Sequence, residues 1–142
     1  MIVPDVNVLL YVVDSDAALH PSASDWWESV VSGPELIGIA DVVDLAVVRL
    51  TTNRRIFPGA LTPQDAFSAV AAWHDLPRVR RLAPGPRHRS IWRDLVVGRG
   101  VGGNLVNDAF LAALAIEHDA TLVSYDTDFA IFPGLRWTTP AE

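Results

Sequence analysis

Short apolar runs alternate with longer segments of helical periodicity along the chain. Residues 1–3, 35–40, 79–83 and 121–125 have the length and composition of buried strands, and 136–139 forms a short last one. Strands that alternate with helices are typical of a parallel sheet covered by helices on both faces. The pattern therefore predicts an α/β fold, a three-layer α/β/α sandwich with a central, mostly parallel sheet.

The segments between these runs are predicted helices. They cover residues 8–13, 25–33, 41–52, 63–76, 87–100 and 105–120. Ser22 or Ser24 can cap the second helix, and Thr62 can cap the fourth with Pro63 at its first position. Because no repeat and no composition shift divides the chain, residues 1–142 are predicted to form a single domain.

Composition indicates a folded protein, and the apolar runs are too short for a membrane span. Half of the residues are hydrophobic and 20% are charged, which is typical of a globular chain. The N-terminal apolar run is interrupted by Asp5 and Asn7, and no run approaches the roughly 20 apolar residues of a membrane span. We therefore expect a soluble cytoplasmic protein that does not associate with a membrane.

Two missing residue types exclude several kinds of chemistry. The chain has no cysteine, which excludes disulfides, thiolate metal sites and a cysteine nucleophile. All eleven basic residues are arginine, so phosphate-binding loops that need a lysine and Schiff-base chemistry are excluded as well.

Charge is unevenly distributed along the chain. Residues 1–48 carry eight acids and no arginine, residues 49–99 carry ten arginines against three acids, and residues 100–142 carry six acids against one arginine. A basic segment inside an acidic protein of net charge −6 suggests a polyanion held beside an acidic site. A solvated helix face would give the same pattern.

Carboxylates follow two of the predicted strands. Asp5 ends the first strand, Asp126 and Asp128 follow the run TLVSY, and Asp108 lies in the early turns of the preceding helix. Parallel strands bring their carboxyl ends to one edge of the sheet, so these side chains are expected to lie close together. A single aspartate there often caps a helix or begins a turn, but clustered carboxylates repel one another.

A divalent cation would relieve this repulsion. The oxygen ligands suit Mg²⁺, with Mn²⁺ as a substitute. The four histidines lack ligand spacing and are expected at the surface; they are His20, His74, His88 and His118. A cation held by carboxylates can activate water for attack on a phosphorus centre. Beside an arginine-rich segment, this chemistry fits hydrolysis of nucleic-acid phosphodiesters.

Three stretches together resemble a known family. They are VPDVNVLLY, VVRLTTNRRIFPGALTP with the following GPRHRSIW, and GGNLVNDAFLAALAIEHDATLVSYDTDFAIFPGLRW. In this order they resemble PIN-domain ribonucleases, and more narrowly VapC-type toxins of bacterial toxin–antitoxin pairs in the form common in mycobacteria. The resemblance implies Mg²⁺-dependent cleavage of RNA, a cognate VapB-like antitoxin whose tail can enter the acidic site, and a homodimer.

The resemblance also implies residue roles. Asp5, Asp108 and Asp126 match the family's first, third and fourth metal-binding acids and are the predicted metal ligands and catalytic residues. Asn7 matches a polar position that orients the first acid and is counted with the substrate-binding residues, although it could equally belong to a capping turn. Asp128 is either a further acid of the site or the cap of the turn before Phe129, the second being slightly favoured.

One family acid is absent. The family places a glutamate three residues before the arginine of the second helix, and counting back from Arg49 gives Ala46. Asp41 and Asp44 lie nearby but point about 140° and 200° away from position 46 on an ideal helix. Asp44 interrupts an apolar helix interior and is included among the catalytic candidates, while Asp41 can be a helix N-cap.

The arginines supply candidates for binding phosphate. Arg49 is predicted to bind the substrate, because its helix borders the expected cleft, or to form an internal ion pair. Arg87 and Arg89 at the start of another helix are further candidates, or belong to a solvated face.

Two other classes of function are weaker alternatives. The sequence DTD imitates the signature of haloacid dehalogenase phosphatases, but it lies near the C-terminus and the lysine of that family, which two-component receivers also need, is absent. Ala46 motivates another alternative, a catalytically weakened PIN fold that binds RNA or protein.

Overall fold

The strands and helices alternate as the sequence predicts. In the computed structural model, which describes residues 1–140, the strands are β1 (Ile2–Pro4), β2 (Ile37–Ala40), β3 (Val79–Leu82), β4 (Thr121–Val123) and β5 (Arg136–Thr138). The helices are α1 (Val6–Val13), α2 (His20–Val31), α3 (Asp41–Thr51), α4 (Pro63–His74), α5 (His88–Arg99) and α6 (Asn104–Glu117), with the short 3₁₀ helix η1 (Thr127–Ile131) after β4.

One parallel sheet organises the molecule. Its strand order is β3-β2-β1-β4-β5, and every neighbouring pair is parallel. Ile2 of β1 is paired with Ile37 of β2 on one side and with Thr121 of β4 on the other. The central position therefore belongs to the first strand of the chain, and its neighbour β4 comes from near the chain's end.

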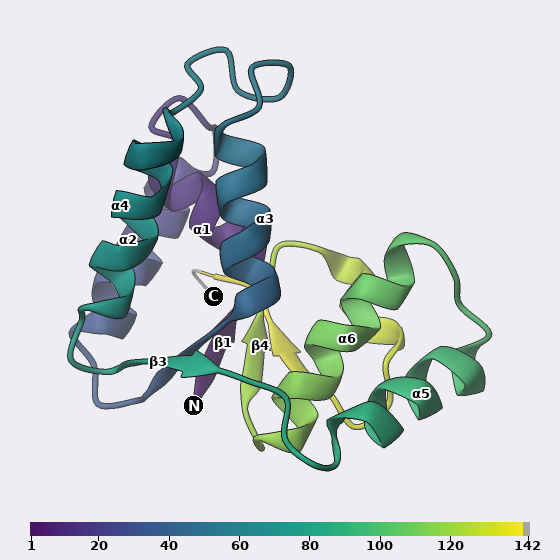
Figure 1. Ribbon diagram of the computed structural model, residues 1–142. Coiled ribbons are helices and arrows are strands. Elements are labelled where there is room, and N and C mark those ends of the chain that lie inside the picture. The colour runs from purple at the N-terminus through teal and green to yellow at the C-terminus, as the bar shows by residue number, and fades with distance from the viewer. Residues whose placement is uncertain (141–142) are drawn as a thin grey trace.

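The helices form two groups, with β1 and β4 between them. Figure 1 shows α1–α4 together at upper left and α5 with α6 at lower right. Strand residues such as Val3, Ile37, Ile39 and Leu122 are fully buried, which explains the apolar composition of these runs. The predicted α/β sandwich with a central parallel sheet is confirmed.

Helix ends test the capping predictions. Thr62 caps α4 as expected, because its hydroxyl accepts a hydrogen bond from the backbone N–H of Asp65 at 3.1 Å. The prediction that Ser22 or Ser24 caps α2 is wrong: this helix begins at His20, and its N-cap residue Leu19 makes no side-chain cap. The Ser24 hydroxyl instead contacts the ring of His20.

No helix within residues 1–140 combines the length and the apolar character that crossing a membrane requires.

Candidate active site

Asp5 is fixed at the carboxyl end of β1. Its side chain is buried, with 8% of the residue exposed, and both carboxylate oxygens accept hydrogen bonds. Oδ1 accepts from the backbone N–H of Val6 at 2.7 Å and caps α1, and Oδ2 accepts from the Ser124 hydroxyl at 2.7 Å. Burial raises the pKa of Asp5 and the nearby charge of Asp126 adds to the rise, whereas the two hydrogen bonds oppose it.

Ser124 joins the ends of β1 and β4. Its fully buried hydroxyl donates to Asp5 and accepts from the Asn7 side-chain amide and from the Asp126 backbone N–H, both at 3.0 Å. The amide oxygen of Asn7 in turn accepts from the Tyr125 N–H at 3.2 Å. Sequence reasoning missed Ser124, and the available signal was a lone serine in the apolar run just before Asp126.

Three further carboxylates gather next to this network. Asp108, Asp126 and Asp128 each place one carboxylate oxygen so that all three atoms lie within 4.8 Å of one another. Burial raises the pKa of Asp108 to about 6, and the charges of Asp5, Asp126 and Asp128 contribute to the rise. Like charges at this separation disfavour ionisation unless a cation lies between them.

Asp128 belongs to this cluster and does not cap the turn. The cap of η1 is Asp126, whose Oδ1 accepts from the Asp128 backbone N–H at 2.9 Å. The slightly favoured prediction that Asp128 caps the turn before Phe129 is therefore wrong. Because Asp126 takes the capping role, the Asp128 carboxylate remains exposed and joins the other two acids.

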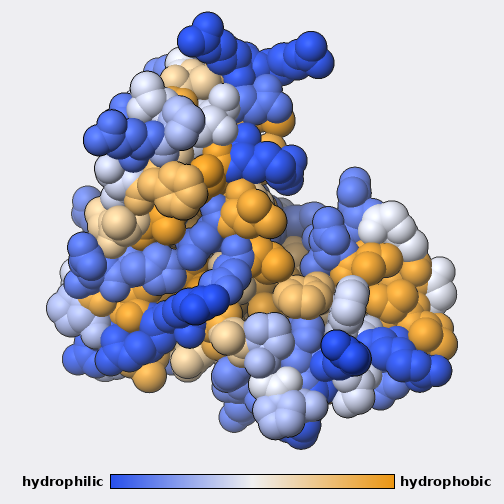
Figure 2. Space-filling view, in the orientation of Figure 1, coloured by the Kyte–Doolittle hydropathy of each residue, from blue (hydrophilic) through white to orange (hydrophobic). Residues whose placement is uncertain are grey.

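A cavity of about 630 Å³ opens from Asp5 and Asp108 between the two helix groups. Figure 2 shows a hollow between the two masses of the molecule, with hydrophobic residues gathered along its walls. Ala46 and Arg49 of α3 line one side. Arg49 is exposed and forms no ion pair within residues 1–140, so the alternative of an internal ion pair is not realised and its guanidinium is available to a ligand.

The structure does not bring Asp44 or Asp41 into the cavity. Asp44 faces α4, where its Oδ2 lies 2.8 Å from His74 Nε2, and its buried Oδ1 has no hydrogen-bond partner among residues 1–140. Asp41 follows the N-cap residue Ala40 and pairs with Arg81, so it is not the N-cap of α3. The rotation of α3 explains both positions, because it turns Ala46 and Arg49 toward the cavity.

At the start of α5, the structure agrees with the alternative of a solvated face for the two arginines and differs from expectation for the histidine. Arg87 and Arg89 are exposed but do not line the cavity, and Arg87 donates to the backbone carbonyl of Glu117 at 3.0 Å. His88 is 3% exposed, so the prediction of a surface position is wrong for this histidine. Its ring packs edge-on against Phe110 and its Nε2 lies 2.9 Å from the carbonyl oxygen of that residue.

The donor set of the cluster suits a hard divalent cation. Asp108, Asp126 and Asp128 offer carboxylate oxygens beside the buried Asp5, the chain has no cysteine, and no histidine of residues 1–140 belongs to the group. Burial and, in addition, the charges of Asp5, Asp126 and Asp128 raise the pKa of Asp108, and a bound cation would offset both effects. The residues present therefore fit a carboxylate-held metal ion.

Comparison with known proteins places this chain in a family. The family model for the PIN domain matches residues 2–135. The chain belongs to the PIN-domain family. This PIN domain is 43% identical to ribonuclease VapC37 of Mycobacterium tuberculosis over 140 residues, which cover 99% of this chain and 97% of that protein. It is 39% identical to ribonuclease VapC33 of the same organism over 140 residues, at 99% and 98% coverage.

Solved structures show the same fold at lower identity. VapBC2 from Rickettsia felis, bound to a DNA fragment from its promoter, aligns to this PIN domain with a TM-score of 0.73 and 19% identity over 99% of both chains. Mycobacterium tuberculosis VapC20, described as a toxin that cleaves the sarcin–ricin loop, aligns with a TM-score of 0.67 and 21% identity, covering 96% of this chain and 99% of that one.

Proposed function

We propose that this PIN domain, residues 1–142, is a Mg²⁺-dependent endoribonuclease and the toxin of a toxin–antitoxin pair. The observation that carries the proposal is the approach of three acids from positions far apart in the chain: Asp5 and Asp108 line one cavity, and Asp126 lies in the carboxylate cluster with Asp108. Relatives named ribonuclease VapC, 43% and 39% identical over nearly the whole chain, support the assignment of RNA as the substrate.

Asp5, Asp108 and Asp126 would hold the ion, with Asp128 as an additional oxygen ligand. When bound, Mg²⁺ or Mn²⁺ supplies an activated water and neutralises charge that develops on the phosphodiester. Ser124 and Val6 hold the Asp5 carboxylate in one orientation by donating to both of its oxygens. Asn7 fixes the Ser124 hydroxyl from the other side, so we assign it a positioning role rather than contact with the substrate.

Arg49 would bind the RNA backbone. Its guanidinium lies on the cavity wall without an acidic partner in the described chain, and guanidinium groups bind phosphate oxygens through paired hydrogen bonds. Asp44 is left out of the catalytic set, because its carboxylate is directed to His74.

Solved structures with this fold indicate which partner proteins to expect. Solved structures with this fold include VapBC complexes from Rickettsia felis and nontypeable Haemophilus influenzae. We therefore propose a VapB-like antitoxin as the partner that neutralises this chain. We also propose a homodimer as its own assembly and the cytoplasm as its location, as expected from the sequence.

The proposal is tested by RNA hydrolysis. Purified protein is incubated with total RNA and Mg²⁺, with EDTA, and with Mn²⁺ added after EDTA. We expect cleavage only with metal and loss of cleavage in Asp5→Asn, which keeps the size and one acceptor oxygen of the side chain. Equal degradation by the wild type and by Asp5→Asn would assign the activity to a contaminant and refute the proposal.

A second candidate function is a PIN fold that binds RNA without efficient cleavage. Ala46 favours it, since this position lines the cavity where the family pattern has a glutamate, so the site holds one acid fewer. Saturable RNA binding without hydrolysis at any Mg²⁺ or Mn²⁺ concentration would support this candidate over the nuclease.

A further inference from the structure

The cavity has a second chemical character beyond its carboxylates. Trp92 of α5 lines it together with Asn104 and Asn107 of α6. The opposite side is formed by α3, where Val42 and Leu45 are exposed to 38% and 67%. One end of the cavity is therefore acidic, while the remainder has an aromatic wall, an aliphatic wall and two amides.

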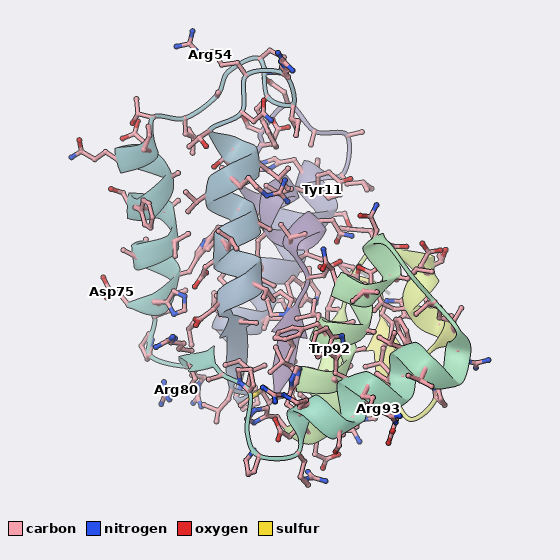
Figure 3. The ribbon with its side chains drawn as sticks, turned by 45° about the vertical axis from the view of Figure 1, so that its right-hand side comes forward. Tyr11, Arg54, Asp75, Arg80, Trp92 and Arg93 are labelled. Carbon is pink, nitrogen blue, oxygen red and sulfur yellow. The ribbon has the colours of Figure 1, made fainter. Side chains whose placement is uncertain are left out.

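The indole of Trp92 is held in a fixed orientation although it is only partly buried. Its Nε1–H donates to the carbonyl oxygen of Val106 at 3.1 Å. Its ring centroid lies 6.2 Å from that of His88 in a stacked arrangement and 5.1 Å from that of Phe110 in an edge-on arrangement. Figure 3 shows Trp92 above α5 and beside α6. A rigid, partly exposed ring is suited to stacking a flat ligand.

Asn104 and Asn107 provide free hydrogen-bonding groups beside this ring. They lie three residues apart and so share one face of α6, and both are exposed. Within residues 1–140 neither side chain makes a hydrogen bond to another residue, while Asn107 directly precedes Asp108 of the carboxylate cluster. Carboxamides offer both donors and acceptors and match the edges of nucleobases.

We propose that Trp92, Asn104 and Asn107 form a nucleobase subsite that holds one unpaired RNA base beside the carboxylate cluster. The inference takes its substrate class from the proposed ribonuclease function. The cavity volume of about 630 Å³ lies in the range of small-ligand sites, about 300–1,000 Å³. A base can stack on Trp92 only when it is turned out of a helix, so the subsite selects single-stranded or looped RNA.

A protein segment is the other class of ligand that an apolar cavity could take. The unpartnered amides favour a base, because an apolar segment that covered them would leave their donors and acceptors without hydrogen bonds. Arg49 on the facing helix favours the same choice, since it can bind the phosphate of the nucleotide whose base stacks on Trp92.

The test measures binding separately from cleavage. Fluorescently labelled octamers of adenosine, of uridine and of abasic ribose phosphate are titrated with Asp5→Asn protein in Mg²⁺, and anisotropy gives the dissociation constants. Trp92→Leu, added to Asp5→Asn, is expected to weaken adenosine octamer binding about tenfold, the effect of losing one stacked base. Binding of the abasic octamer should not change, because the backbone contacts remain.

Two further variants distinguish recognition from folding. Trp92→Phe retains an aromatic face and should recover most of the lost affinity. Trp26→Leu removes a half-buried tryptophan of α2 that does not line the cavity and should leave both dissociation constants unchanged. Melting temperatures of all variants show whether a loss of affinity follows from unfolding.

Unchanged binding of the adenosine octamer by Trp92→Leu would overturn the inference and leave the cavity to a protein partner. An equal loss for the abasic octamer would also overturn it, since the effect would then not depend on a base. Failure of the wild type to cleave RNA would refute the proposed nuclease but not the subsite, because these measurements require binding alone.

Discussion

At the scale of single residues, the site depends on how one buried carboxylate is oriented. Asp5 has both oxygens occupied by hydrogen-bond donors, so its position does not depend on a bound ion. The single hydroxyl of Ser124 donates to Asp5 and accepts from the Asn7 amide and from the backbone N–H of Asp126. The serine therefore sets the geometry of residues from both ends of the chain.

Replacing Ser124 tests this role. In Ser124→Ala the Asn7 amide and the Asp126 N–H lose an acceptor and Asp5 loses a donor, so we expect the free energy of unfolding to fall by about 1–3 kcal/mol. Affinity for Mn²⁺ should fall about tenfold or more, as when a ligand's supporting hydrogen bond is removed. Urea unfolding and Mn²⁺ titration measure the two effects. Ser90→Ala, at an exposed serine of α5, is the matched control, and equal behaviour of both variants would contradict the role.

The raised pKa of Asp108 predicts how the stability of the metal-free protein depends on pH. Its pKa of about 6 in the folded chain exceeds the ordinary 3.8, so between these values the folded state binds more protons than the unfolded state. The contribution of this group to the free energy of unfolding therefore falls as the pH rises from 3.8 to about 6, and the loss is complete above this range.

Asp108→Asn removes this penalty. At neutral pH and without metal we expect the variant to be more stable than the wild type by about 1 kcal/mol, a value reduced for the partial exposure of the carboxyl group. The difference should shrink as the pH is lowered toward 3.8. Thermal unfolding across this range measures it, and a wild type that is more stable at neutral pH would contradict the prediction.

Much of the site could be predicted from residue positions, but not all of it. Asp5 and Asp126 follow strands, and the carboxyl ends of parallel strands meet, so their proximity follows from the fold class. The capping role of Asp126 and the contacts of Ser124 depend on side-chain directions in one turn. A linear pattern contains no information on which of two nearby aspartates directs its oxygen to the backbone.

At the scale of elements, helix α3 separates two environments. Ala46 and Arg49 line the cavity, while Asp44 contacts His74 of α4 on another face. The spacing of these positions predicts that they diverge, but only packing against α4 decides which face meets the cavity. The sequence alone therefore supports a catalytic Asp44, whereas the structure directs this side chain to His74 of α4.

The contact between Asp44 and His74 should support the fold rather than catalysis. In His74→Ala both carboxylate oxygens of the half-buried Asp44 lack a partner, and we expect a loss of about 1–3 kcal/mol in the free energy of unfolding. RNA cleavage by the folded variant should be unchanged. Asp75→Ala, at the exposed neighbouring residue, serves as the control. A loss of cleavage at unchanged stability would return Asp44 to the site.

The cavity face of α3 also allows the missing acid to be restored. In Ala46→Glu the new carboxylate enters the cavity beside Arg49, so we expect affinity for Mn²⁺ to rise about tenfold with the added ligand charge. Without metal the same variant should melt at a lower temperature, because another negative charge joins the cluster. Ala46→Gln, of similar size but neutral, should show neither effect. Calorimetric Mn²⁺ titration and thermal unfolding compare the three proteins.

At the scale of the whole molecule, metal binding should stabilise the fold. The cluster joins α6 to the turn after β4, with Asp5 at the end of β1 beside it, so an ion bound there would hold these segments together. At a concentration about 100 times its dissociation constant, Mn²⁺ should add about 2.7 kcal/mol to the free energy of unfolding. Sodium chloride at equal ionic strength controls for screening of the net charge of −6. An equal rise of the melting temperature in Asp5→Asn would place the ion elsewhere.

The pairing of β1 with β4 has a consequence during protein synthesis. A ribosome makes Asp5 long before Asp126, and these two acids meet only when β4 adds to the sheet beside β1. A nascent chain interrupted before β4 therefore has no assembled carboxylate cluster. Translation itself delays the moment at which this protein can first act on RNA in the cell that makes it.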